Sequence, residues 1–260
     1  AELITADYII IATGAIERPM PVRGWTLPGV MSVGGAQTLL KQAALGADDA
    51  VFVGSGPLLY LTVWQYIKAG LAVRAVIDIT GAEQWRSAIP FAPLALLQPD
   101  MLAMGRKWLR DIRQNTEVIK YVSAVEITGQ SQAQGVSCTL SSGGKIDIDS
   151  NHIFLHQGVV PNVNLTMATG LEHQWDHQAH CWRPVTDVTG KSSDQQIYIA
   201  GDGGGIGGAK AAAIAGRLAA SAIVARCGKP RFLTQLYYKL RHLHYLSIRP
   251  FLDRLYLPPV

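Results

Sequence analysis

Cysteine is scarce in this chain of 260 residues. Its three cysteines, Cys138, Cys181 and Cys227, are isolated, so no CxxC pair is available for a redox-active disulfide, a zinc ribbon or an iron–sulfur cluster. We interpret them as ordinary thiols. Their low number fits a reducing compartment, and we predict a cytoplasmic protein.

Long apolar runs are also missing. No apolar run of about 20 residues is free of charge, which is the length that a membrane-spanning helix needs. The first residues lack the basic segment that begins a signal peptide. We therefore predict no membrane span.

Acidic residues are nearly absent from the end of the chain. From Arg226 onward, seven Lys or Arg residues stand against one acid, Asp253. A basic segment can bind nucleic acid, but here Phe232, Leu236 and Leu240 recur between the charges at helical spacing. We predict that residues 226–260 form a basic amphipathic helical tail that packs on its own domain or on a partner. We do not expect this tail to bind nucleic acid.

Glycine and apolar residues are abundant instead. The chain has 26 glycines and is 48% hydrophobic, which suits an α/β fold with a buried parallel sheet. Residues 50–78 have the order of a dinucleotide-binding βαβ unit. An apolar strand enters a turn at Gly54 and Gly56, Pro57 suits the first position of a helix, and Gly70 suits its end. A second strand then ends in Asp78.

This unit predicts a nucleotide site. We expect the phosphates to bind at the turn and the helix start, formed by Gly54, Ser55, Gly56, Pro57 and Leu58. Asp78 is expected to bind a free ribose 2′-hydroxyl, which favours NAD over NADP. The third fingerprint position is Leu59 instead of glycine, so we expect the helix to lie further from the strand or the side chain to lean away.

Two further landmarks flank this unit. A strand over residues 4–12 ends in Thr13 and Gly14, which is either a plain turn or a close approach to a flavin nucleotide. A strand over 196–200 leads to Gly201 and Asp202, before an alanine-rich helix that ends near Arg226. Asp202 either accepts a hydrogen bond from a flavin ribityl hydroxyl or only caps that helix.

The remaining segments are predicted from periodicity and turn residues. We expect helices over 32–45, with Ser32 as N-cap, and over 99–114, and antiparallel strands between 118 and 148. Residues 87–97 are predicted to be irregular. The histidines and tryptophans of 173–182 lack metal-ligand spacing, so we favour a solvated loop over a metal site.

Taken together, these landmarks resemble the two-dinucleotide flavoproteins. More closely, the chain resembles the FAD/NAD-binding subunit of bacterial opine oxidases, hydrogen cyanide synthase and related amine or imino-acid dehydrogenases. The segments that carry this resemblance are Ile11–Pro19, Gly24–Val30, Gly34–Leu40, Gly54–Leu59, His156–Asn162, Gly201-Asp202 and Gly207–Ala209. It implies cofactor contacts, with FAD and NAD, at Thr13, Gly14, Gly158, Gly201, Asp202, Gly207, Gly208 and Ala209.

The resemblance also implies a domain plan. We expect a three-layer Rossmann-like fold: residues 1–46 and 150–225 form a partial FAD-type domain, and 47–149 form an inserted NAD-type domain with a small antiparallel layer. The FAD phosphate loop that begins such proteins is absent from this sequence. We therefore expect a fragment that binds FAD weakly or not at all.

The expected function is that of a subunit of a flavin-dependent pyridine-nucleotide oxidoreductase, which acts with a partner subunit on an amine, opine or imino acid. Two alternatives stay open: a non-catalytic nucleotide-binding or assembly module, and an NADH-dependent reductase of the same superfamily. A disulfide reductase is disfavoured because the cysteine pair is missing. We assign no catalytic residue and no metal ligand; Glu17, Tyr60 and Asp202 are the polar residues expected nearest the cofactors.

Overall fold

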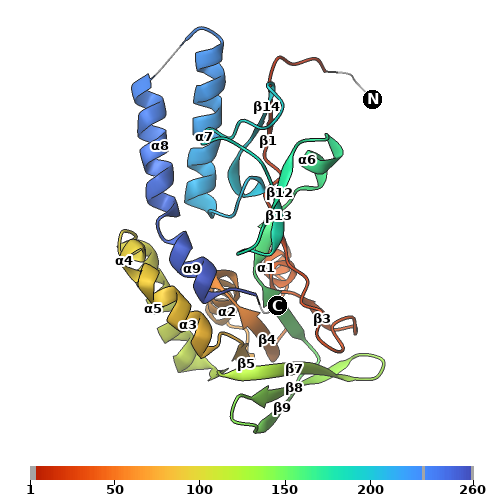
Figure 1. Ribbon diagram of the computed structural model, residues 1–260. Helices are drawn as coiled ribbons and strands as arrows, with labels where there is room; N and C mark the ends of the chain where they lie inside the picture. The colour runs from red at the N-terminus through yellow and green to blue at the C-terminus, as the bar shows by residue number, and fades with distance from the viewer. Residues whose placement is uncertain (1–3, 230–231, 259–260) are drawn as a thin grey trace. The chain divides into compact units, whose positions relative to one another are not determined.

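The computed structural model describes residues 4–229 and 232–258, and the chain divides into two compact units (Figure 1). The first unit contains the residues up to Ile16, Pro93–Gln98 and Val159–Asp253. The second unit contains Glu17–Ala92, Pro99–Gly158 and the residues from Arg254 onward. Neither unit is one continuous stretch of sequence.

A parallel five-stranded sheet forms the centre of the second unit. Its strands, in spatial order, are β3 (Val30–Ser32), β10 (Ile153–Gln157), β4 (Ala50–Ser55), β5 (Val73–Asp78) and β6 (Glu117–Ile119). Successive side chains of a strand point to opposite faces. Val51 and Val53 therefore pack on one side of β4 and Phe52 packs on the other, and all three are fully buried.

Helices cover one face of this sheet. They are α1 (Val33–Ala43), α2 (Pro57–Lys68) and α5 (Pro99–Asn115), which match the predicted helices. Ser32 is the N-cap of α1, as predicted, and its Oγ accepts a hydrogen bond from the Gly35 amide at 3.1 Å. Phe52 contributes about 1.5–3 kcal/mol to stability by its burial under these helices.

An antiparallel sheet covers the other face. It consists of β7 (Val122–Gly129), β8 (Ala133–Leu140) and β9 (Lys145–Asp149), whose apolar side chains pack against Val51, Val53 and Ile77. The second unit thus has helices, a parallel sheet and an antiparallel sheet as its three layers. The predicted α/β class with a small antiparallel layer is confirmed.

Two parts of the prediction differ from the structure. The region 87–97 is not irregular, because it contains the end of α3 (Ala82–Ala88), the 3-10 helix η1 (Ile89–Phe91) and α4 (Ala92–Ala95). The prolines that suggest irregularity occupy early positions of these short helices, where proline is tolerated. The predicted domain limits also differ from the two units, because β3 and β10 hydrogen-bond into the same sheet as β4.

The first unit contains short strand pairs and longer helices. Its elements are β1 (Ile9–Ile11) paired with β14 (Ile197–Ile199), β2 (Ala15–Glu17) with β11 (Val159–Pro161), β12 (His173–Asp176) with β13 (Cys181–Pro184), α6 (Asn164–Ala168), the 3-10 helix η2 (Gly201–Gly203), α7 (Ala209–Arg226) and α8 (Phe232–Leu246). Helix α9 (Arg249–Leu255) passes from this unit into the second.

The predicted loop at 173–182 is instead the hairpin β12–β13. Trp175 and Trp182 face each other across it, with ring centroids 5.5 Å apart in an edge-on arrangement. Such cross-strand aromatic pairs stabilise antiparallel strands. The run of His, Gln and Trp lacks the apolar alternation by which a strand is recognised in sequence.

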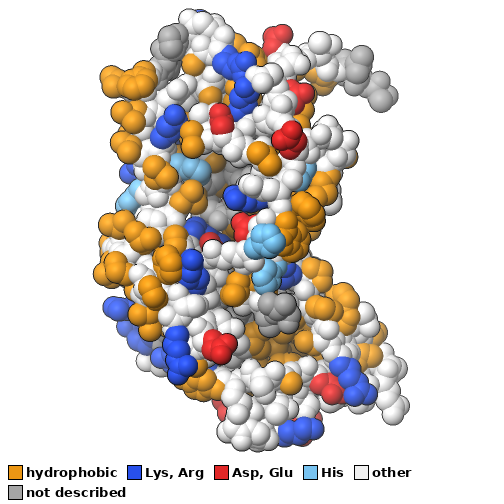
Figure 2. Space-filling model, viewed as in Figure 1, with side chains coloured by type: hydrophobic (Ala, Val, Ile, Leu, Met, Phe, Trp, Pro, Cys, Tyr) orange, Lys and Arg blue, Asp and Glu red, His pale blue; other side chains and the backbone are white. Residues whose placement is uncertain are grey.

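The predicted basic tail at 226–260 contains α8 and α9, and its residues 230–231 and 259–260 lie outside the described part of the chain. Helix α8 runs beside α7 (Figure 1), and Gln235 Nε2 donates a hydrogen bond to the Ser221 carbonyl at 3.0 Å. Apolar side chains remain exposed along α8, where Figure 2 shows hydrophobic groups at the surface; they include Phe232, Leu233 and Leu240. Within the described residues, no helix has both the length and the apolar character to cross a bilayer.

Candidate nucleotide-binding site

The turn between β4 and α2 needs glycine at two positions. Gly54 has φ of +139°, and a Cβ there would lie 1.8 Å from the His156 carbonyl oxygen. Gly56, with φ of +113°, is the N-cap of α2, and no side chain caps this helix. Pro57 occupies the first turn. An uncapped helix N-terminus that leaves amide groups unpaired is suited to bind phosphate.

Leu59 does not obstruct this turn. Its side chain is fully buried with Phe52 and Val63 in the core between α2 and the sheet. Leu58 is half-buried, and Pro57 is exposed. A leucine at the third fingerprint position is therefore accommodated beneath the helix.

Asp78 lies at the end of β5 and is already hydrogen-bonded. It is 3% exposed. Its Oδ2 accepts a hydrogen bond from the Tyr60 hydroxyl at 2.6 Å, and its Oδ1 accepts one from the Thr80 amide at 2.9 Å. Lys120 Nζ lies 3.8 Å from Oδ2. In this conformation Tyr60 and Thr80 each occupy one acceptor position on the nearly buried carboxylate.

Burial keeps Tyr60 in its donor form. Burial first, and then the negative charge of Asp78, raises the pKa of Tyr60 above its ordinary value. Tyr256 lies beside Tyr60, with ring centroids 6.4 Å apart, and burial together with Asp78 raises its pKa as well. The phenol of Tyr60 thus stays protonated and donates to the carboxylate.

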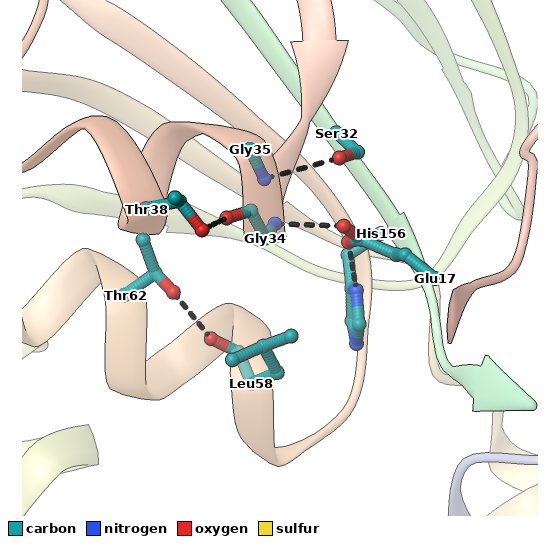
Figure 3. A network of polar contacts seen from close by, with 8 residues as sticks. All are labelled: Glu17, Ser32, Gly34, Gly35, Thr38, Leu58, Thr62 and His156. Atoms are coloured by element: carbon teal, nitrogen blue, oxygen red, sulfur yellow. Dashed lines mark hydrogen bonds and ion pairs between the residues drawn. The ribbon is translucent and has the colours of Figure 1, made fainter. Parts of the chain in front are cut away.

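A second polar network lies beside the turn (Figure 3). His156 Nδ1 is 2.5 Å from Glu17 Oε1, and Glu17 Oε2 accepts a hydrogen bond from the Gly34 amide at 2.7 Å. His156 is 2% exposed and comes from the carboxyl end of β10. The sequence alone predicts no partner for Glu17, because 139 residues separate it from His156.

In the first unit, the flavin-type landmarks form a single cluster of turns. Thr13 Oγ1 donates a hydrogen bond to the Asn162 carbonyl at 2.8 Å, and a Cβ on Gly203 would lie 3.0 Å from the same Oγ1. The Asn162 amide donates to the Gly14 carbonyl at 2.9 Å. Gly14 has positive φ and an open space where a Cβ would stand.

Asp202 organises the turn before α7. Its Oδ1 accepts hydrogen bonds from the amides of Gly207 at 2.9 Å and Gly208 at 3.0 Å. Gly208 is the N-cap of α7, and Ala209 is its first residue. Asp202 therefore does stabilise the helix start, while its Oδ2 has no hydrogen-bond partner in the described part of the chain.

Gly158 belongs to the other unit. It has φ of +84°, and its carbonyl accepts a hydrogen bond from the Arg18 amide at 3.0 Å. Gly158 follows β10 directly, so it belongs to the second unit.

Gly201, in the first unit, also has positive φ, and a Cβ there would lie 3.3 Å from the Ala212 Cβ.

No metal-like cluster accompanies these sites. No group of three or more His, Cys, Asp or Glu side chains within residues 4–229 and 232–258 is arranged to hold a metal ion. His173 is engaged elsewhere, through Nε2 with Thr166 at 2.9 Å and through Nδ1 with the Leu171 carbonyl at 2.8 Å.

One hollow lies away from the glycine turn. It has a volume of about 490 Å³ and is lined by residues at the far ends of α1 and α2, among them Lys41, Gln65 and Lys68. These side chains are exposed or half-buried, so it is an open depression. We place the candidate site at the turn, where the backbone geometry is constrained.

A parallel sheet with a glycine turn that leads into an uncapped helix is typical of dinucleotide-binding α/β proteins. Residues 1–219 match the pyridine nucleotide-disulphide oxidoreductase family, and the chain belongs to this family. Membership implies binding of a flavin and a nicotinamide cofactor.

Relatives of known name refine this assignment. The chain is 42% identical to an opine oxidase subunit of Rhizobium meliloti, over 99% of this chain and 50% of that protein. It is 31% identical to hydrogen cyanide synthase subunit HcnB of Pseudomonas aeruginosa, over 84% of this chain and 48% of that protein. The predicted resemblance is confirmed, and the chain spans about half the length of these relatives.

Solved structures support the fold. L-proline dehydrogenase from P. horikoshii matches with a TM-score of 0.61 and 16% identity, over 92% of this chain and 38% of that one. Thioredoxin reductase from T. acidophilum matches with a TM-score of 0.53 and 15% identity, over 94% and 66% respectively.

Proposed function

We propose that this chain is part of a subunit of a flavin-dependent pyridine-nucleotide oxidoreductase, and that it acts with a partner subunit on an amine, opine or imino acid. The geometry of the turn before α2 carries the nucleotide-binding part of this proposal. The similarity to an opine oxidase subunit supports the substrate class. Both this relative and HcnB are named as subunits, which supports the partner.

The proposed nicotinamide nucleotide is NAD. The turn and helix start, Gly54 to Leu58, bind its pyrophosphate, because α2 begins there without a side-chain cap. Asp78 accepts a hydrogen bond from a ribose hydroxyl, which replaces the hydrogen bond from the Tyr60 hydroxyl. A buried carboxylate repels a 2′-phosphate, which favours NAD over NADP.

The proposed flavin contacts lie on the turns of the first unit and at Gly158. Asp202 Oδ2 accepts a hydrogen bond from a ribityl hydroxyl, since Oδ1 already accepts hydrogen bonds from two amides. The open space at Gly14 admits close approach of a cofactor to the backbone. The remaining proposed contacts are Thr13, Gly158, Gly201, Gly207, Gly208 and Ala209. The two cofactors supply hydride and electron transfer, and the chain's residues bind and orient them.

The alternative is a non-catalytic nucleotide-binding or assembly module. It is favoured by the exposed apolar side chains of α8, which include Leu233 at 78% and Phe232 at 74% exposure. Exposed apolar patches mark surfaces that bind other chains.

Titration of the chain with NADH and FAD, followed by reduction of a dye with NADH in the presence of FAD, tests these functions. We expect Gly56→Ala to weaken NADH binding at least tenfold, because it places a Cβ at φ of +113° in the phosphate turn. Gly70→Ala is the matched control: Gly70 lies just beyond the other end of α2 with φ of +80° and open space around it. NADH binding without dye reduction favours the module, and absence of NADH binding overturns both nucleotide-binding proposals.

A further inference from the structure

His156 lies directly beside the glycine turn. In the pairing of β10 with β4, His156 is opposite Gly54, and Gln157 is opposite Ser55. A Cβ on Gly56 would lie 3.5 Å from His156 Nε2. The imidazole of this buried residue therefore points its Nε2 at the N-terminus of α2.

The other side of the ring is fixed. Nδ1 is paired with Glu17, and Figure 3 shows the ring between Glu17 and the chain that leads into α2. Glu17 is held in turn by the Gly34 amide, in the first turn of α1. A Cβ on Gly34 would lie 2.6 Å from Glu17 Oε2, so this close approach needs glycine.

Nε2 is the ring nitrogen of His156 that has no partner in this network. In the described part of the chain it has no hydrogen-bond partner, although the side chain is 2% exposed. It is not among the fully buried atoms that lack a partner, so Nε2 itself reaches the open space beside the turn. An accessible ring nitrogen of an otherwise buried histidine, facing an uncapped helix N-terminus, suits an anionic ligand between the two.

We propose that His156 Nε2 is a ligand of the nucleotide pyrophosphate and that Glu17 positions its ring; this rests on the proposed nucleotide function. Nδ1 donates its hydrogen to a hydrogen bond with Glu17, so Nε2 donates to a phosphate oxygen only when the ring is an imidazolium. The bound anion completes a row of alternating charge: carboxylate, imidazolium, phosphate. Among the described residues, Glu17 is the charged side chain within ion-pair distance of His156.

Inorganic pyrophosphate and NADH are the probes. Calorimetry is carried out on the wild-type chain, on His156→Gln and Glu17→Gln, and on His152→Gln as control, because His152 is exposed just before β10. We expect His156→Gln to weaken both ligands about tenfold or more, in line with a charge-assisted hydrogen bond. Glu17→Gln weakens them less, and His152→Gln leaves them unchanged.

A nitrogen-15 spectrum of the histidine rings in the wild-type chain gives a readout that does not depend on a stable variant. We expect the Nε2 signal of His156 to shift when pyrophosphate is added. Pyrophosphate binding with an unmoved signal, or equal affinity in His156→Gln and wild type, overturns the assignment. Pyrophosphate binding with a shifted signal but without NADH binding supports it and rejects the NAD proposal. Binding of neither ligand rejects both.

Discussion

The hydrogen bond between Tyr60 and Asp78 leads to a quantitative prediction about Tyr60→Phe. Both side chains are buried, and the Tyr60 Oη to Asp78 Oδ2 distance is 2.6 Å. Hydrogen bonds to charged groups contribute about 1.5–3 kcal/mol. We expect the variant to lose about this much free energy of unfolding, measured by urea denaturation at pH 7.

The same variant should bind NADH more tightly. If the ribose displaces the Tyr60 hydroxyl, the bond exists in the free protein and is absent from the complex. Its removal then destabilises the free protein alone, and a gain of about 1.5–3 kcal/mol corresponds to roughly 10- to 150-fold in Kd. The gain in binding free energy cannot exceed the loss in unfolding free energy.

Tyr66→Phe provides the control for this experiment. Tyr66 also lies in α2, is 1% exposed, and has its hydroxyl hydrogen-bonded to the backbone of Ala47 instead of to Asp78. It should lower stability without changing NADH affinity. An unchanged or weaker NADH affinity in Tyr60→Phe, together with the expected loss of stability, would refute the exchange at Asp78.

Three further predictions concern stability. Asp202→Ala removes the side chain that accepts hydrogen bonds from two amides before α7, and it should lower the free energy of unfolding, measured by urea denaturation, by about 1–2 kcal/mol. Asp202→Asn should lower it less. Equal losses in the two variants would contradict a capping role of Asp202. Gly54→Ala should prevent stable folding, because the added Cβ would lie 1.8 Å from the His156 carbonyl oxygen. Gly105→Ala is the control: Gly105 lies inside α5 and has open space around it, so this variant should raise the melting temperature slightly. The hydrogen bond from Trp64 lowers the pKa of Asp111, so the stabilisation by this bond is present above the unfolded pKa and disappears as pH falls through the lower folded pKa. We therefore expect Trp64→Phe to be less stable than the wild type at neutral pH, and the difference to become smaller below about pH 4. A difference in stability that does not depend on pH would contradict this.

Much of the second unit follows from local sequence signals. Gly54, Gly56 and Pro57 mark the end of a buried strand and the start of a helix, and the predicted βαβ unit at 50–78 is confirmed. Signals of this kind are short in range. Prolines near residue 90 suggest an irregular chain, although each is compatible with the first turn of a helix.

The polar contacts of the site could not be predicted in this way. Tyr60 and Asp78 belong to different elements, and nothing in either element specifies that one hydroxyl reaches that carboxylate. The pairing of His156 with Glu17 depends on where β10 enters the sheet, and residues far apart in sequence determine that position. Sequence periodicity indicates which residues are buried, but not which polar atoms meet.

The pairing of β1 with β14 has a consequence for how the chain folds. These strands run parallel, with Ile9 beside Ile197, and most of the chain lies between them. Closing so long a loop has a large entropic cost before any contact offsets it, and topologies rich in distant contacts fold slowly. During synthesis, β1 must wait until the chain has been extended to Ile199 before its partner strand exists. We expect refolding of the first unit to be the slow phase, with Ile9 and Ile10 exposed to chaperones in the meantime.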